Sequence, residues 1–277
     1  MSYKRVLTIQ DISCVGQCSL TVALPILSAC GLETAIIPSA VLSTHTAGFS
    51  GYTFRDLTDD IPKITEHWVK ENIKFDAIYT GYLGSTKQID YVKSIFDKVS
   101  LENTVKIVDP AMADGGKLYP AFDCEYVEAM KELVSQADIV IPNITEACFL
   151  TDTEYKTECT PDYIEELISK LKKLGAKTAV ITGVSYNSGK TGIAVSSDSI
   201  NSYYEHDVIG KGCHGTGDVY ASAFVGAYTK GKDLLESAKI AADYTVECIK
   251  LTKDDPEHWY GVKFELAPPK LIEMLSK

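Results

Sequence analysis

The stretch that most constrains the fold of this chain runs from Val208 to Ala227, where a glycine-rich loop becomes a helix of small residues. Gly212, Gly215 and Gly217 can adopt backbone angles closed to other residues and leave room for a ligand beside the main chain. Small and apolar residues then repeat at helical spacing, so the first-turn amides of that helix have no partner within it. Free amides at the positive end of a helix dipole favour phosphate. The stretch predicts an anion site at a helix N-terminus.

Asp218 adds a carboxylate to this predicted anion site. An acid is expected there if it takes a proton from an attacking hydroxyl while the amides stabilise a transferring phosphoryl group. The alternative is that Asp218 is a first-turn acid that caps its own helix, which is a common arrangement. The stretch alone leaves both interpretations open.

Two other glycine patterns match phosphate motifs only in part. Residues 210–215 spell G-x-G-x-x-G, but they lie far from the first strand, where a dinucleotide-binding fingerprint is expected. Gly189-Lys190-Thr191 resembles the end of a P-loop, but Gly183 is one residue too far upstream and an alternating, strand-like segment follows. Neither pattern is interpreted as a nucleotide motif.

Length and charge restrict the class of protein. The 277 residues contain no Pro/Ser/Gly linker and no shift in composition, so we predict a single domain over residues 1–277. A net charge of -11 argues against nucleic acid or an anionic membrane as a partner. No leader opens the chain and no apolar run approaches the ~18 residues of a membrane span, so a cytoplasmic location is expected. The eight cysteines form neither a zinc pattern nor a disulfide framework.

Short apolar runs alternate with segments of helical periodicity along the chain. This strand, helix, strand order predicts an α/β fold with a central, mainly parallel sheet and helices on both faces. An alternating pair of strands is expected to cover one edge of the sheet. The predicted strands are residues 5–10, 34–40, 77–79, 105–108, 139–141, 178–181, 190–196 and 201–207, and the clearest helices are residues 19–30, 233–250 and 269–276.

Polar clusters follow the predicted parallel strands, at the edge of the sheet where ligands bind in such folds. Carboxylates in these loops are suited to a hydrated Mg²⁺ beside nucleotide phosphates. Taken singly, Asp114 and Glu146 fit a turn and a helix start, and the hydroxyl-rich loop around His45 is equally well explained as plain surface. The clusters are residues 11–18, 41–51, 81–85, 109–116, 142–146 and 182–183.

The order of these motifs resembles the ribokinase-like superfamily and, within it, the pyridoxal/pyridoxamine kinases. The resemblance covers almost the whole chain. It implies the fold described above, a homodimer, and transfer of the γ-phosphoryl group of ATP to the 5′-hydroxymethyl group of a vitamin B6 vitamer. The motifs are Gln10-Asp11, Ser43-Thr-His45-Thr46, Gly81-Tyr82-Leu-Gly84, Asp109-Pro-x-x-x-Asp114, Pro142-Asn143-x-x-Glu146 and Gly215-Thr-Gly-Asp218.

The same resemblance implies a role for each matching position. Asp218 would be the catalytic base, and the amides of Gly215, Thr216 and Gly217 would form the anion hole. The implied cofactors are ATP and Mg²⁺, and a requirement for a monovalent cation such as K⁺ is left open. The remaining implied residues are Asp11, His45, Thr46 and Tyr82 for the substrate, Asp109, Asn143, Thr182 and Gly183 for the nucleotide, and Asp114 and Glu146 for the metal.

Asp11 departs from the family pattern, because Ser follows the first-strand Gln in the family members compared. A carboxylate there would pair with a protonated ring nitrogen or an ammonium group, as in pyridoxamine, or it would weaken B6 recognition. Cys213-His-Gly-Thr-Gly also resembles the hydroxymethylpyrimidine kinases of thiamine synthesis, which typically carry Cys in the position of Asp218. The acid therefore favours a B6 kinase. A pyrimidine kinase or dual-activity enzyme, a sugar kinase and a non-catalytic ligand sensor remain alternatives.

Overall fold

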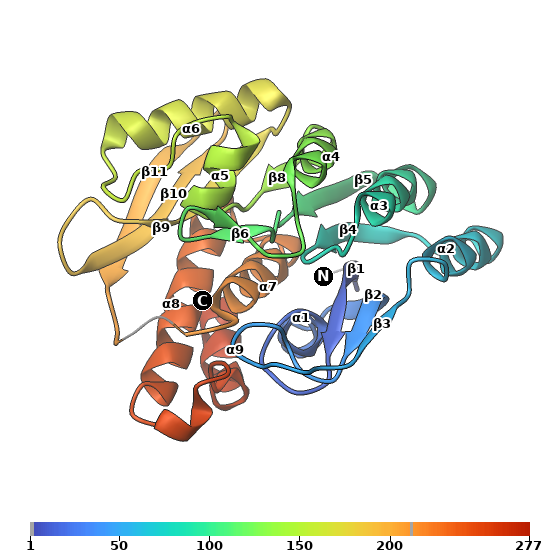
Figure 1. The fold of residues 1–277 in the computed structure, drawn as a ribbon, viewed down its shortest axis with the longest axis horizontal. Helices are drawn as coiled ribbons and strands as arrows, with labels where there is room; N and C mark the ends of the chain where they lie inside the picture. Colours follow the sequence, from blue (N-terminus) through green and yellow to red (C-terminus); the bar gives the residue numbers. More distant parts are fainter. Residues whose placement is uncertain (1–2, 211–212) are drawn as a thin grey trace.

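The computed structural model describes residues 3–210 and 213–277, which fold around a nine-stranded sheet (Figure 1). The strands lie in the order β11-β10-β9-β8-β5-β4-β1-β2-β3. Neighbours from β9 to β2 are parallel, and β10, β11 and β3 join the two edges antiparallel. The predicted α/β fold is confirmed. The strands are β1 (Arg5–Ser13), β2 (Glu33–Leu42), β3 (Phe54–Asp56), β4 (Phe75–Thr80), β5 (Ser100–Val108), β8 (Ile139–Val140), β9 (Thr178–Val184), β10 (Lys190–Ser196) and β11 (Asn201–Asp207).

Helices cover both faces of the sheet, as Figure 1 shows. One face carries α1 (Leu20–Ala29), α7 (Thr216–Thr229), α8 (Leu234–Thr252) and α9 (Pro268–Ser276), with the short helices η1 (Pro256–His258) and η2 (Phe264–Leu266) nearby. The other face carries α2 (Ile61–Lys70), α3 (Thr86–Lys98), α4 (Cys124–Val134), α5 (Ile144–Leu150) and α6 (Pro161–Leu174). A two-stranded hairpin, β6 (Ala113–Asp114) and β7 (Lys117–Leu118), lies outside the main sheet.

Side chains of the central strands alternate between two apolar cores, one on each face of the sheet. Val6 packs with α1 and α7, whereas its neighbour Leu7 packs with the opposite helices. In β4, Tyr79 and Ile78 divide in the same way. Because both faces are buried, apolar residues occupy consecutive positions of these strands, which is why the sequence reads as short apolar runs.

The chain changes direction across the sheet at β1. From β1 it moves outward to β2 and β3, and then returns to β4 on the other side of β1. A crevice is expected outside the carboxyl ends of the strands at such a switch point. The pairing of β1 with β2 also shifts register between Gln10 and Ile12, so Asp11 lies at an irregularity of the ladder. Irregularities of this kind redirect a side chain next to a site.

Helix α7 packs very closely against α1. A Cβ atom at Gly226 would lie 2.4 Å from the Cys30 sulfur, so only glycine fits at this crossing. Ten of the fourteen residues of α7 are buried, and most of them are small. This packing fixes the helix whose first turn carries Asp218.

The predicted strand pair over residues 190–196 and 201–207 has the expected bounds and covers one edge of the sheet. The predicted helix over 233–250 is α8, which extends two residues further. Throughout residues 3–210 and 213–277, each helix is too short or too polar to cross a membrane.

Candidate active site

The start of α7 is held against the loop between β1 and α1. Gly215 is the N-cap of α7 with φ 75°, and a Cβ atom there would lie 1.7 Å from the carbonyl oxygen of Gln17. Gly217 is exposed and has open space where a Cβ atom would be. The Thr216 hydroxyl donates to the carbonyl of Cys213 at 3.2 Å. Gly215 therefore fastens the loop, while Gly217 leaves the first-turn amides accessible to a ligand. Gly212, which the same prediction used, lies outside the described residues.

Asp218 lies in this first turn and is partly exposed. The backbone N–H of Ser19 favours the charged form of the Asp218 carboxylate. Burial raises the pKa of Asp218 to about 7; the Ser19 N–H opposes this shift and the negative charge of Asp11 adds to it. A carboxyl group with a pKa near neutrality exchanges a proton efficiently at neutral pH.

Ser19 joins Asp218 to Asp11. It pairs with Ile12, next to Asp11. Its hydroxyl favours the charged form of Asp11, and its backbone N–H favours the charged form of Asp218. Ser19 is buried and has φ 55°, a backbone conformation that residues other than glycine rarely adopt. Sequence reasoning missed this residue. The available signal was a hydroxyl residue immediately before the first helix, within a loop already singled out as polar.

Asp11 is almost completely buried, with 5% of its surface exposed. Ser13 Oγ donates to Asp11 Oδ2 at 3.1 Å. Burial raises the pKa of Asp11, while its hydrogen bonds and the nearby His45 oppose the shift. Tyr82 is also close, because the charge of Asp11 contributes, after burial, to a rise in the pKa of Tyr82 to about 12. The carboxyl ends of β1 and β4 thus bring Asp11 and Tyr82 together, as the sequence predicts.

His45 fastens two loops together through its ring. Nε2 lies 2.7 Å from the carbonyl oxygen of Tyr260, and Nδ1 accepts from the Ala47 N–H at 3.2 Å. These partners require a proton on Nε2 and none on Nδ1, and burial lowers the pKa of the ring. Both ring nitrogens therefore have protein partners in a neutral His45. Thr46, next in the sequence, is exposed.

A capping box organises the loop after β8. Asn143 is the N-cap of α5: Oδ1 accepts from the Glu146 N–H at 2.9 Å, and Glu146 Oε2 accepts from the Asn143 N–H at 2.9 Å. Both side chains also reach the segment that enters the β6–β7 hairpin. Glu146 Oε1 accepts from the Met112 N–H at 3.1 Å, and Asn143 Nδ2 donates to the Ala113 carbonyl at 2.8 Å. The two residues thus position the hairpin that carries Asp114.

Carboxylates gather at the carboxyl ends of β5 and β8. Asp109 is buried, and its pKa is raised well above the ordinary value by burial and then by the negative charges of Glu146 and Asp218. Burial also raises the pKa of Glu146, against the effect of its amide partners. Asp114 is exposed, and its Oδ1 accepts from the Gly115 N–H at 2.8 Å. Asp109 and Glu146 therefore lie within electrostatic reach of each other, and Asp109 within reach of Asp218.

The acidic group around Asp109 can contribute only part of the ligands of a Mg²⁺ ion. In the described part of the chain, no three His, Cys, Asp or Glu side chains converge closely enough to hold a metal ion by themselves. The oxygens of Glu146 already accept backbone amides. Mg²⁺ commonly keeps several waters and binds through one or two carboxylates and substrate phosphates. The residues fit such a hydrated ion near Asp109 and Asp114, with Glu146 as a positioning residue.

The predicted nucleotide residues Thr182 and Gly183 lie near the end of β9, beside this group. The Thr182 N–H donates to the Pro142 carbonyl at 2.9 Å, next to Asn143. Gly183 is exposed, with φ 75° and no atom within 4 Å of a Cβ position. A ligand can therefore approach the backbone at Gly183.

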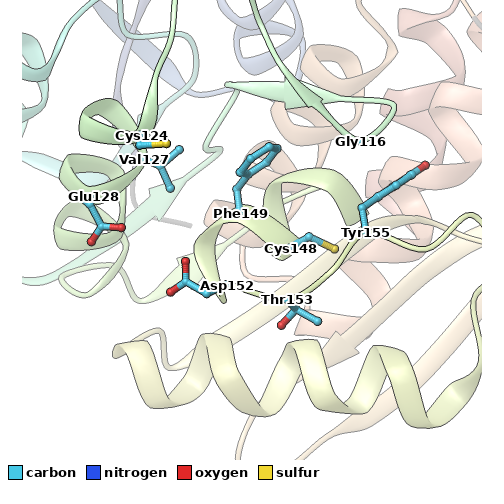
Figure 2. Close-up of a pocket in the computed structure, with 9 residues that line it drawn as sticks. All are labelled: Gly116, Cys124, Val127, Glu128, Cys148, Phe149, Asp152, Thr153 and Tyr155. Atoms are coloured by element: carbon cyan, nitrogen blue, oxygen red, sulfur yellow. The ribbon is translucent and has the colours of Figure 1, made fainter.

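A pocket of about 280 Å³ lies elsewhere, around α4, α5 and the loop that follows α5 (Figure 2). Phe149 and Tyr155 point toward it, and Glu128 and Asp152 flank it. None of the predicted site residues lines this pocket. We therefore place the candidate active site at the strand ends described above.

The predicted residues form two groups. Asp11, Tyr82, His45 and Asp218 surround the ends of β1 and β4, and Asp109, Asn143, Glu146 and Thr182 lie around the ends of β5, β8 and β9. Asp218 connects them, because its charge acts on Asp109 and it is itself acted on by Asp11. The arrangement can hold a small alcohol on one side of a carboxylate and an anionic group on the other.

Known proteins with similar sequences are kinases. The sequence pattern of the phosphomethylpyrimidine kinase family matches residues 26–262. The chain is 30% identical over 204 residues to the pyridoxal kinase of Dictyostelium discoideum, an alignment that covers 71% of this chain and 65% of that protein. It is 29% identical over 197 residues to the hydroxymethylpyrimidine/phosphomethylpyrimidine kinase of Aquifex aeolicus, covering 67% of this chain and 74% of that protein.

The fold has a near match among solved structures. A Bacteroides thetaiotaomicron protein named as a phosphomethylpyrimidine kinase, in its crystal form with pyridoxal, superposes with a TM-score of 0.91 and is 32% identical. The superposition covers 100% of this chain and 96% of that protein.

Proposed function

The chain belongs to the phosphomethylpyrimidine kinase family, and from this premise we propose that it transfers the γ-phosphoryl group of ATP to the hydroxymethyl group of a vitamin B6 vitamer. One observation carries the proposal. Asp218, with a pKa of about 7, lies in the first turn of α7, between the buried Asp11 and the acidic group around Asp109. A base between an alcohol site and a phosphate site is what this transfer requires.

Asp218 takes the proton of the substrate hydroxyl while the hydroxyl oxygen attacks the γ-phosphorus of ATP. The bond between the γ-phosphorus and the β,γ-bridging oxygen breaks, and ADP leaves. The amides of Gly215, Thr216 and Gly217 stabilise the charge on the transferring group. The nucleotide phosphates extend toward Asn143, Thr182 and Gly183, and the backbone at Gly183 is open to a ligand. Most of the rate comes from positioning and charge stabilisation, because phosphoryl transfer needs little covalent chemistry from the protein.

Mg²⁺ would neutralise the phosphate oxygens when bound with ATP. Asp109 and Asp114 would hold it, largely through water. Glu146 acts indirectly: it fixes the backbone of Met112 and Asn143 and so orients the loop that carries Asp114.

Phosphorylation of the aminopyrimidine alcohol of thiamine synthesis, alone or beside B6 kinase activity, is the second candidate. The family pattern and the Aquifex aeolicus relative favour it. Asp218 supports the B6 assignment, because the resemblance associates Cys at that position with the pyrimidine kinases.

The homodimer implied by the resemblance remains a proposal, which light scattering after gel filtration tests.

The direct test is ADP release with pyridoxal, pyridoxamine, pyridoxine and the aminopyrimidine alcohol. We expect turnover with the B6 vitamers, and a loss of roughly 10² to 10⁴ in kcat for Asp218→Asn, since that is the usual contribution of a general base. Asp233→Asn is the matched control, because Asp233 also lies at the start of a helix but caps α8. Wild-type turnover by Asp218→Asn would exclude the proposed base, and ADP release with the pyrimidine alone would exclude the B6 assignment.

A further inference from the structure

Asp11 is a buried carboxylate without a cationic partner among residues 3–210 and 213–277. The groups that act on it are the hydroxyls of Ser13 and Ser19, its own backbone N–H and His45. His45 has the smallest influence of these, because Nδ1 accepts the Ala47 N–H, which requires an unprotonated Nδ1, and burial lowers the pKa of the ring. The remaining titratable neighbours are Asp218, Cys18 and Tyr82, none of which is cationic.

An arrangement of this kind destabilises the empty protein. Removing a carboxylate from water is unfavourable unless a cation or several strong donors replace the solvent. The two serine hydroxyls are partial replacements, and desolvation remains the largest influence on Asp11. Uncompensated buried charges of this type are expected at functional sites, where a ligand completes the interaction.

The position of Asp11 limits which part of a substrate reaches it. Ser19 pairs with Ile12, next to Asp11, and the Gln17 carbonyl lies against Gly215 at the start of α7. The loop after β1 therefore brings Asp11 close to the helix turn that carries Asp218. The reacting hydroxyl must lie against Asp218. A substituent on the same small ring is then within reach of Asp11.

We propose that Asp11, held by Ser13 and Ser19, binds an ammonium group on a ring substituent of the alcohol substrate. Pyridoxamine, with its aminomethyl group, is then preferred over vitamers that have an uncharged substituent in that place. This inference rests on the proposed function. Ser19 is a positioning residue in it, because it lies beside Ile12 and acts on Asp11 through its hydroxyl and on Asp218 through its backbone N–H.

The same geometry ties substrate charge to the base. The negative charge of Asp11 raises the pKa of Asp218. An ammonium group bound to Asp11 cancels that effect, so Asp218 stays deprotonated to lower pH. The acidic limb of the pH profile of kcat for pyridoxamine is therefore expected at lower pH than that for pyridoxine.

The test compares kcat/KM for pyridoxamine, pyridoxine and the aminopyrimidine alcohol in wild type, Asp11→Asn and Ser19→Ala. Asn keeps the shape of Asp11 and removes its charge. We expect the pyridoxamine to pyridoxine ratio to fall about tenfold or more in Asp11→Asn, in line with a lost hydrogen bond to a charged group. The pyrimidine amino group is neutral, so its kcat/KM should change less than about threefold. Ser19→Ala keeps the backbone N–H to Asp218 and should lower the same ratio.

Asp138→Asn is the control variant. Asp138 precedes β8, at the amino ends of the parallel strands and away from the candidate active site, and forms an ion pair with Lys177. An equal loss for pyridoxamine and pyridoxine in Asp11→Asn, which would indicate contact with the shared ring nitrogen, overturns the proposal. If Asp11→Asn does not fold, the proposal is tested by the melting temperature of the wild-type protein with each vitamer and without nucleotide. Pyridoxamine should raise its melting temperature more than pyridoxine at equal concentration, and an equal or smaller rise overturns the proposal. A wild-type protein that releases no ADP with any of the substrates contradicts the proposed function instead.

Discussion

Gly215 shows how a single residue fixes the candidate anion site. Its φ of 75° and the carbonyl of Gln17, 1.7 Å from a Cβ position, make any side chain there both strained and overlapping.

We therefore expect Gly215→Ala to lower the free energy of unfolding by about 1–3 kcal/mol and to reduce kcat sharply, because the first turn of α7 must move. Urea denaturation and ADP release measure the two effects. Gly217→Ala is the matched control for stability, since a Cβ atom there meets open space. Equal stability losses for the two variants would contradict the assigned role of Gly215.

The raised pKa of Asp218 predicts a pH dependence of the reaction. A base must be deprotonated to accept the substrate proton, so kcat/KM should fall as pH decreases through about 7. The measurement is kcat/KM for pyridoxine from pH 5 to 9, with buffers matched in ionic strength. A profile that stays flat from pH 8 down to pH 5 would show that Asp218 is not the limiting base.

For single residues, the sequence predicts which side chains carry a chemical role better than it predicts which residues they contact. Asp218 and Gly215 are identifiable because a glycine-rich loop before a helix has few uses. Ser19 is not, because its role depends on the ends of β1 and α7 meeting in space. The Nε2 partner of His45 lies more than 200 residues away in sequence, at Tyr260, and no local pattern signals such a contact.

Among the elements, α5 depends on the capping box of Asn143 and Glu146. The box satisfies the first turn of the helix and also holds the strand that enters the β6–β7 hairpin. The capping box therefore connects the start of α5 to the segment that carries Asp114.

We expect Asn143→Ala to lower the free energy of unfolding by about 1–2 kcal/mol through loss of the cap, and to raise the KM for ATP because the hairpin is released. Asp123→Ala is the matched control, since Asp123 caps α4 by accepting from the Tyr126 N–H. It should lose similar stability with an unchanged KM for ATP. A raised KM in both variants would assign the effect to general destabilisation.

Element positions were largely predictable and their bounds less so. The central strands carry apolar residues on both faces, which makes them easy to find in the sequence, and the pair β10 and β11 has the predicted bounds. The hairpin of β6 and β7 has two residues in each strand, too few for any periodicity. Helix α5 has seven residues and lacks a clear apolar stripe for the same reason.

Across the whole molecule, one sheet runs without interruption from β11 to β3, with an apolar core on each face. Its strands come from all three thirds of the chain, from β1 at Arg5–Ser13 to β11 at Asn201–Asp207. The proposed single domain follows from this continuity, because neither half of the sheet has a core of its own.

We accordingly expect a single cooperative transition on unfolding. Differential scanning calorimetry should give one peak, and far-UV circular dichroism and tryptophan fluorescence should change together in urea, with Trp68 and Trp259 reporting on separate parts of the molecule. Two resolved calorimetric peaks, or probes with different midpoints, would indicate two independently folding units.

Strand order is the part of the architecture that sequence reasoning left open. Parallel pairing alone predicts that the loops after β1, β4, β5, β8 and β9 share one edge. It does not say that β4 returns beside β1, which is what brings Tyr82 close to Asp11. That neighbourhood depends on long-range packing of α1 and α7 on one face and α2 and α3 on the other.

The contact between Gly226 and Cys30 has a consequence for how this protein can diverge. Because α7 cannot shift against α1, Asp218 stays in one place while the loops around it change. Mutations in the loops after β2 and β4 can then alter which alcohol is accepted without disturbing proton transfer. A lineage with this core would acquire new substrates through its loops, and the helix pair beneath them would change slowly.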